Sequence, residues 1–215
     1  MSWTNFKFPV NATPDQIACV LAIGYLLGCI ATGYYLVRII IHKDIRLEGS
    51  GNTGARNVGR LLGPPGFMAV LLFDLGKGAL AVWIARQISP DDLLAVLALL
   101  AVTIGHIWPA QLRFRGGKGV SPSLGALLVL DYRLAFTFVA LAVAGLALLR
   151  NFTLGGLLAF ALLPLAALKW QQSPTVVSGL VLLAGLVLFA HRKNIEEEIM
   201  RHARREPAPK PEEKT

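Results

Sequence analysis

The apolar positions of this chain fall in long uninterrupted runs, and polar residues are concentrated in the short segments between them. Runs of about 20 apolar residues can cross a bilayer as α-helices. The pattern predicts seven helical spans, at residues 16–41, 66–87, 93–107, 120–130, 134–148, 153–168 and 175–189. The fourth would reach only about 16 Å as a helix, so it either extends into its flanks or is a re-entrant segment.

Composition and charge agree with an all-α integral membrane protein with seven transmembrane helices. Hydrophobic residues make up 54% of the 215 residues, and only 16% are charged. The mean hydropathy is +0.57, and the apolar runs lack the polar stripes of helices in soluble bundles. Lys and Arg gather in alternate connections, at 42–65, 108–119, 149–152 and in the tail from 190. Cytoplasmic loops collect such residues, which places the N-terminus outside and the C-terminus in the cytoplasm.

This topology divides the chain into three parts. Residues 1–15 form an extracytoplasmic segment, 16–200 the seven-helix membrane domain, and 201–215 a charged cytoplasmic tail that we expect to be disordered. The first span is too long for a cleaved signal peptide, and basic residues follow it. Cys19 and Cys29 would lie about 15 Å apart on one helix, too far for a disulfide, so both are expected to be buried thiols.

The composition also argues against several classes of function. No Cys/His cluster has the spacing of a metal site, so neither a metal nor another cofactor is expected. The formal net charge of +8 follows from topology and anionic lipid headgroups, and no nucleic-acid-binding module is recognisable.

The polar segment at residues 49–60 has the residues of an anion site. Its glycines match G-x-G-x-x-G, but no strand precedes them, so a dinucleotide fingerprint is excluded. Successive N–H groups of small residues can surround an anion, Ser50 and Asn52 add donors, and Arg60 can bind a phosphate with two hydrogen bonds. Arg56 and Arg60 are four apart and could share a helix face. The alternative is a simple glycine-rich connection.

A second polar segment, at residues 113–119, resembles a phosphate loop without being a Walker A motif. Its Gly-Gly-Lys-Gly stands at the entrance to the fourth span, where backbone N–H groups and Lys118 would face an anion. A lysine-containing turn is the alternative. His106 is expected to shape the preceding helix end.

Other polar residues occur singly or in pairs. Thr153 is expected to cap a helix, and His191 and Asn194 project from similar faces of a helix end. Asp74 and Lys77, three apart within the second span, predict an ion pair inside the membrane or at its boundary that positions the site.

Taken in order, these segments resemble the signatures of the bacterial acyl-phosphate-dependent glycerol-3-phosphate acyltransferases, PlsY. The first signature is similar to residues 49–63 followed by Asp74-x-x-Lys77-Gly78. The second is similar to Gly105-His106-x-x-Pro109 and residues 114–120, and the third to residues 191–195. The ordered set covers the chain from the first span to the tail.

The resemblance implies a multi-pass enzyme of the bacterial cytoplasmic (inner) membrane, with its active site facing the cytoplasm. It would transfer a fatty acyl group from acyl phosphate to the 1-hydroxyl of glycerol 3-phosphate, giving lysophosphatidic acid and phosphate. Motif positions imply catalytic roles for Ser50, Arg60, Lys118, His191 and Asn194. They imply substrate or phosphate binding by Gly49, Gly51, Asn52, Gly54, Asn57, Gly116, Gly117, Gly119 and Thr153, and supporting roles for Asp74, Lys77 and His106.

Departures from the family pattern concern Arg56, where Thr is common, Pro122, which replaces a usual Thr, and Thr153, which replaces a usual Ser. An acyl phosphate is already activated, and no Ser-His-Asp order or cysteine nucleophile is evident. We therefore expect direct attack by the glycerol hydroxyl, with its proton accepted by a substrate phosphate oxygen or by His191.

Other classes fit the sequence less well. An acyl-CoA-dependent acyltransferase needs an H-x4-D box, and a CDP-alcohol phosphotransferase needs an aspartate cluster; both are missing. The remaining alternative is a membrane transporter of phosphate or a small organic anion, which would place polar groups near the midplane.

Overall fold

The computed structural model describes residues 12–203, and all regular secondary structure in that range is helical. The elements are α1 (Pro14–Cys29), α2 (Thr32–Ile41), α3 (Ala55–Ile88), α4 (Asp92–Ile107), α5 (Val120–Leu130), α6 (Tyr132–Leu149), α7 (Phe152–Lys169), α8 (Pro174–Ala190) and α9 (Arg192–Ala203), with 3₁₀ turns at Ile45–Leu47 and Ala110–Leu112. The five predicted spans from 93 to 189 are confirmed as helices to within two residues at each end.

The first apolar run is not one helix, as predicted, but two. Ile30 and Ala31 leave the helical conformation between α1 and α2. Neither glycine nor proline stands there. The break is stabilised from outside, because Lys77 Nζ donates hydrogen bonds to the carbonyl oxygens of Gly28 at 3.2 Å and Ile30 at 2.9 Å. Carbonyl groups that lose their helical partners are thereby satisfied.

Helix α3 begins well before the predicted second span. It starts at Ala55, so the second half of the first polar segment is helical rather than loop. Gly63 interrupts it with φ 70° and ψ −167°, and Pro64 and Pro65 follow. A positive φ is a conformation that glycine adopts readily, and the two prolines resume the helix after the kink. Arg56 and Arg60 are consequently one turn apart on the first helical segment.

Within the described residues, five helical segments are long and apolar enough to cross a membrane: Pro14–Ile41, Ala55–Ile88, Asp92–Leu112, Tyr132–Leu149 and Phe152–Lys169. The pair Pro174–Ala190 and Arg192–Met200, bent by 58°, gives a sixth if it is counted as one span. Val120–Leu130 is apolar but shorter. The prediction of seven spans therefore stays a prediction.

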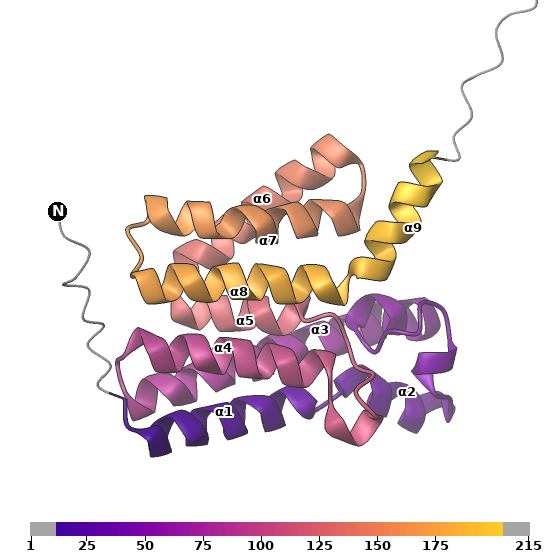
Figure 1. Cartoon of the computed structure of the whole chain (residues 1–215). Helices are drawn as coiled ribbons and strands as arrows, with labels where there is room; N and C mark the ends of the chain where they lie inside the picture. Colours follow the sequence, from indigo (N-terminus) through magenta and orange to yellow (C-terminus); the bar gives the residue numbers. More distant parts are fainter. Residues whose placement is uncertain (1–11, 204–215) are drawn as a thin grey trace, which may run out of the picture.

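The helices run back and forth between two ends of the bundle (Figure 1). At one end, which we call the polar end, lie the connections at 42–54, 108–119 and 150–151 and the junction at His191. Helix α4 lies centrally and contacts α1, α3, α5 and α8. The three polar segments predicted to share one face do share one end of the bundle.

Small residues allow these helices to approach closely. A Cβ atom on Gly28 of α1 would overlap the α4 backbone at Val102, and Gly145 of α6 and Gly155 of α7 meet backbone to backbone. Such contacts are typical of helix packing in membranes, where close van der Waals approach replaces the hydrophobic drive available in water.

Two smaller expectations need correction. Cys29 is buried as expected, but Cys19 is exposed on α1; both thiols are free. Helix α9 runs to Ala203, so helix occupies the start of the segment predicted to be disordered from 201. The rest of that tail, 204–215, and residues 1–11 of the predicted N-terminal segment lie outside the described residues.

Candidate active site

A cavity of about 450 Å³ opens at the polar end, between α3, α5, α6 and α7. Its cationic part, as we call it, is lined by Ser50, Asn52, Arg60, Lys118, His191 and Asn194. Its apolar arm is lined by Phe67, Leu71, Leu124, Phe138, Val139, Ala142, Val143, Leu146, Leu157 and Phe160. All five residues predicted to be catalytic thus line one cavity, although they come from segments up to 144 positions apart, 50 to 194.

The first polar segment is organised by the buried side chain of Asn57. Its Oδ1 accepts a hydrogen bond from the backbone N–H of Ser50 at 3.0 Å. Its Nδ2 donates to the carbonyl oxygens of Glu48 at 3.0 Å and Asn52 at 2.9 Å. The amide predicted to bind phosphate therefore holds the loop that presents Ser50 and Asn52.

Gly49 and Gly51 serve this loop rather than the cavity. Both have positive φ, 55° and 69°, and neither lines the cavity. A Cβ atom on Gly49 would overlap Asn57 Oδ1. The structure does not support their predicted direct contact with phosphate. Gly54 does line the cavity, where it precedes α3.

The second polar segment presents Lys118 differently from the prediction. The N–H groups of Gly116 and Gly117 donate to the carbonyl oxygens of Ile107 and His106, at 3.1 and 2.9 Å, and neither glycine lines the cavity. Their predicted role in surrounding an anion is therefore not supported. Gly119 does line the cavity, with φ 83° at the start of α5.

Lys118 joins the second and third polar segments. Its ammonium donates to Asn194 Oδ1. Lys118 is half-buried, and this burial lowers the pKa of its ammonium; nearby Glu197 opposes the shift and Arg56 adds to it. A partly desolvated ammonium interacts more strongly with a substrate anion than an exposed one does.

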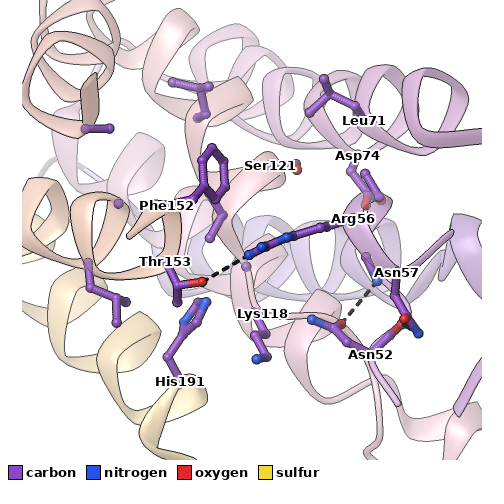
Figure 2. Close-up of a pocket in the computed structure, with 18 of the residues that line it drawn as sticks. Asn52, Arg56, Asn57, Leu71, Asp74, Lys118, Ser121, Phe152, Thr153 and His191 are labelled. Carbon is purple, nitrogen blue, oxygen red and sulfur yellow. Dashed lines mark hydrogen bonds between the residues drawn. The ribbon is translucent and has the colours of Figure 1, made fainter. Parts of the chain in front are cut away.

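His191 ends α8 with a defined orientation. Its Nδ1 lies 2.8 Å from the carbonyl oxygen of Val187, an acceptor, so Nδ1 carries the proton and donates. Nε2 is then the nitrogen available to a ligand in the cavity, which His191 lines together with Thr153 and Lys118 (Figure 2).

Asp74, in the wall of the cavity, forms the predicted ion pair with Lys77. Lys77 Nζ lies 2.9 Å from Asp74 Oδ1, and the two side chains are only 5% and 2% exposed. Lys77 also contacts His106 Nδ1 at 2.9 Å, and Thr32 donates to Asp74 Oδ1 at 3.4 Å. An ammonium has only donors, so His106 Nδ1 accepts.

His106 does more than shape the end of α4. A Cβ atom on Gly117 would overlap the His106 ring, so the ring packs directly against the backbone that precedes Lys118. Asp74 and His106 line the cavity, whereas Lys77 does not. His106 therefore connects the Asp74–Lys77 ion pair in α3 to the loop that carries Lys118.

Arg56 was absent from the predicted site, and the structure places it there. Its Nη1 donates to Thr153 Oγ1 at 3.2 Å, and its guanidinium lies 5.4 Å from the centroid of the Phe152 ring (Figure 2). Thr153 does not cap α7 as predicted; Asn151 does, which leaves the threonine hydroxyl in the cavity. Ser121 also lines the cavity and was not predicted. The arginine spacing at 56 and 60 was the available sequence signal.

Among residues 12–203, no group of three or more His, Cys, Asp or Glu side chains is placed to hold a metal ion. The arrangement defines a class of protein: a helical membrane protein whose cavity joins cations and hydrogen-bond donors to an apolar arm, as a ligand with an anionic head and an acyl chain requires.

Comparison with known proteins identifies the family. The family model described as glycerol-3-phosphate acyltransferase matches residues 18–201, and the chain belongs to this family, that of PlsY. A glycerol-3-phosphate acyltransferase from Desulfitobacterium hafniense (strain Y51) is 45% identical over 181 residues, covering 84% of this chain and 90% of the relative. One from Synechococcus sp. (strain CC9902) is 41% identical over 177 residues, covering 82% and 88%.

Two solved structures support the same assignment. The crystal structure of PlsY, an integral membrane glycerol 3-phosphate acyltransferase, in its glycerol 3-phosphate form superposes with a TM-score of 0.80 at 27% identity. The lysophosphatidic acid form gives 0.77 at 26%, and both comparisons cover 86% of this chain and 92% of the other. The protein is thus a multi-pass membrane acyltransferase of phospholipid biosynthesis that acts on glycerol 3-phosphate.

Proposed function

We propose that this enzyme takes its acyl group from an acyl phosphate and transfers it to the 1-hydroxyl of sn-glycerol 3-phosphate, releasing lysophosphatidic acid and inorganic phosphate. The observation that carries the proposal is the continuity of the cavity, in which the cationic part opens directly into the apolar arm. A fatty acyl chain fits the arm only if its reactive head lies among the cations, where the second phosphate-bearing substrate also binds.

The cationic part supplies what this reaction needs. The donor carbonyl carries a phosphate leaving group, so catalysis depends on positioning and on stabilising charge that develops in the transition state. Arg60 and Lys118 provide positive charge, and Ser50, Asn52 and Asn194 provide hydrogen-bonding groups at the same surface. Two anionic substrates can then approach each other despite their mutual repulsion.

The transfer is proposed to be direct, without an acyl-enzyme. Neither cysteine lines the cavity. Of the hydroxyls that do, at Ser50, Ser121 and Thr153, none hydrogen-bonds to a histidine or carboxylate within residues 12–203, so none has the base that activates a nucleophile. The glycerol hydroxyl attacks the acyl carbonyl, and a substrate phosphate oxygen takes its proton. His191 Nε2 is the second possible acceptor.

The chain is proposed to cross the bacterial inner membrane seven times, with the N-terminus outside and the polar end in the cytoplasm. The alternation of the helices between the two ends and the basic residues of the polar-end connections support this orientation. In a Cys19→Ser background, a cysteine at Gln171 should react with an impermeant maleimide on intact cells. A cysteine at Arg113 should react only after lysis, and the reverse pattern would contradict the orientation.

The decisive assay measures phosphate release by the purified protein from palmitoyl phosphate, with and without glycerol 3-phosphate. Release that depends on the acceptor, with lysophosphatidic acid as the second product, is expected. Equal release without acceptor would reject the transferase, and equal activity with palmitoyl-CoA would reject the acyl phosphate donor. Lys118→Ala serves as the inactive control, because it leaves the apolar arm intact.

Anion transport, the alternative function, receives less support. The cations of the cavity gather at the polar end, whereas alternating access is built around a binding site near the midplane.

A further inference from the structure

Arg56 takes no part in the mechanism described above, although it lines the same cavity. It stands in the first turn of α3, and its side chain crosses toward the start of α7 (Figure 2). There its guanidinium meets Thr153 Oγ1 and the face of the Phe152 ring. The side chain thus bridges two helices that bound the cavity.

The contact joins parts of the bundle that otherwise meet little. Helix α3 packs against α1, α2, α4 and α5, whereas α7 packs against α6 and α8. Across the described part of the chain, the Arg56–Thr153 hydrogen bond is the only side-chain hydrogen bond found between α3 and the α6–α7 pair. The apolar arm lies between these two groups of helices, with Leu71 on one side and Val143 and Leu157 on the other.

The guanidinium has unused binding capacity. Arginine carries five N–H donors in a planar fork, and its described hydrogen bond to protein uses one of them. Arg56 is also exposed, so its remaining N–H donors are accessible to a ligand. An arginine fork matches the oxygen spacing of a phosphate, with two parallel hydrogen bonds.

Position indicates which phosphate this fork meets. An acyl chain lying against Val143, Leu146 and Leu157 of α6 and α7 leaves the arm beside the start of α7, where Phe152 and Thr153 hold the guanidinium. The head of the acyl donor therefore arrives next to Arg56. The other cations of the cavity are Arg60, one turn further along α3, and Lys118, which comes from the loop before α5 and donates to Asn194 of α9.

We propose that Arg56 is a donor-recognition residue, whose guanidinium binds the phosphoryl oxygens of the acyl phosphate at the junction of the apolar arm and the cationic part. The inference rests on the proposed function, because it takes acyl phosphate as the donor. Thr153 and Phe152 hold the fork in place before the substrate arrives, which reduces the conformational entropy lost on binding.

The test varies each substrate separately. Arg56→Gln removes the charge and the fork, and should raise the KM for palmitoyl phosphate about tenfold to a hundredfold, as expected for lost hydrogen bonds to a charged group. The KM for glycerol 3-phosphate should stay within about twofold. Arg56→Lys keeps the charge without the fork and should lie between wild type and Arg56→Gln. Arg113→Gln, which removes an exposed arginine outside the cavity, is the matched control.

The possible results distinguish a wrong role for Arg56 from a wrong choice of acyl phosphate as the donor. A rise in the KM for glycerol 3-phosphate alone would assign Arg56 to the acceptor and overturn the proposal, as would a loss of kcat with both KM values unchanged. A wild-type protein inactive on acyl phosphate would reject the proposed function instead. A binding measurement without acceptor addresses Arg56 alone: palmitoyl phosphate should raise the melting temperature of the wild type more than that of Arg56→Gln, and equal shifts would reject the inference.

Discussion

Removing Asp74 should destabilise this protein far more than removing any exposed acidic partner. In the wild type, Lys77 Nζ lies 2.9 Å from Asp74 Oδ1, with the two side chains 5% and 2% exposed. Asp74→Asn keeps the shape of the side chain but leaves a buried ammonium without its counter-charge. Breaking a buried pair in this way costs about 3–5 kcal/mol of unfolding free energy.

The reciprocal change should cost more. Lys77→Met leaves the Asp74 carboxylate with the Thr32 hydroxyl, at 3.4 Å, and deprives the buried Gly28 carbonyl of its donor, whereas the Ile30 carbonyl keeps the backbone N–H of Thr32 at 3.0 Å. Each buried acceptor left unsatisfied adds about 1–3 kcal/mol. The double variant Asp74→Asn/Lys77→Met removes both charges, so it should be less destabilised than the sum of the two single changes.

A surface pair provides the matched control. Lys43 Nζ and Glu48 Oε1 lie at the same separation, 2.9 Å, but their side chains are 56% and 32% exposed. Glu48→Gln should cost less than about 1 kcal/mol. Unfolding free energies would be measured by titrating SDS into detergent micelles and following near-ultraviolet circular dichroism. An Asp74→Asn variant within about 1 kcal/mol of the wild type, or single changes that add without coupling, would refute the reasoning.

Four further predictions concern the cavity. Lys118→Ala should lower kcat/KM for acyl transfer by about a hundredfold or more, with retained folding by circular dichroism, and near-normal turnover would contradict its role. Because burial lowers the pKa of Lys118, the ammonium loses its proton below the usual lysine range; activity should fall as pH rises through that pKa, and Lys118→Arg should move the alkaline limb of the rate profile upward. Gly117→Ala should lose most activity, since its Cβ would overlap the His106 ring, whereas Gly185→Ala, with open space around its Cβ, should keep it in the same phosphate-release assay. His191→Gln should lower kcat, and an unchanged kcat would show that Nε2 takes no part in the reaction.

Hydrophobic patterning was sufficient to locate most helices, because apolar length between polar connections determines where a membrane helix can form. It could not locate the break after Cys29, since the residues that stabilise it, led by Lys77, lie more than 40 positions along the chain. Nor did it show that α3 continues through Gly63 and two prolines, because proline after a kink is compatible with a new helical turn.

In the candidate site, the positions of polar side chains could be predicted from the sequence better than the hydrogen-bond partners of the glycine N–H groups. The side chains of Lys118 and His191 line the cavity as predicted, together with the others thought to be catalytic. The glycines were harder to assign, because an N–H group can face a ligand or another carbonyl. Gly116 and Gly117 use theirs on the end of α4. The role of Arg56 depends on a partner 97 positions away, which no local spacing encodes.

The Asp74–Lys77 pair also bears on how the chain enters the bilayer. The two charges are three residues apart on α3, so they neutralise each other within a single helix, without help from a neighbour. The remaining partners of Lys77 lie on both sides of it in the order of synthesis: the carbonyls at the end of α1 are made before it, and His106 on α4 after it. The two buried charges of α3 therefore need no charged partner from another helix when this segment enters the bilayer.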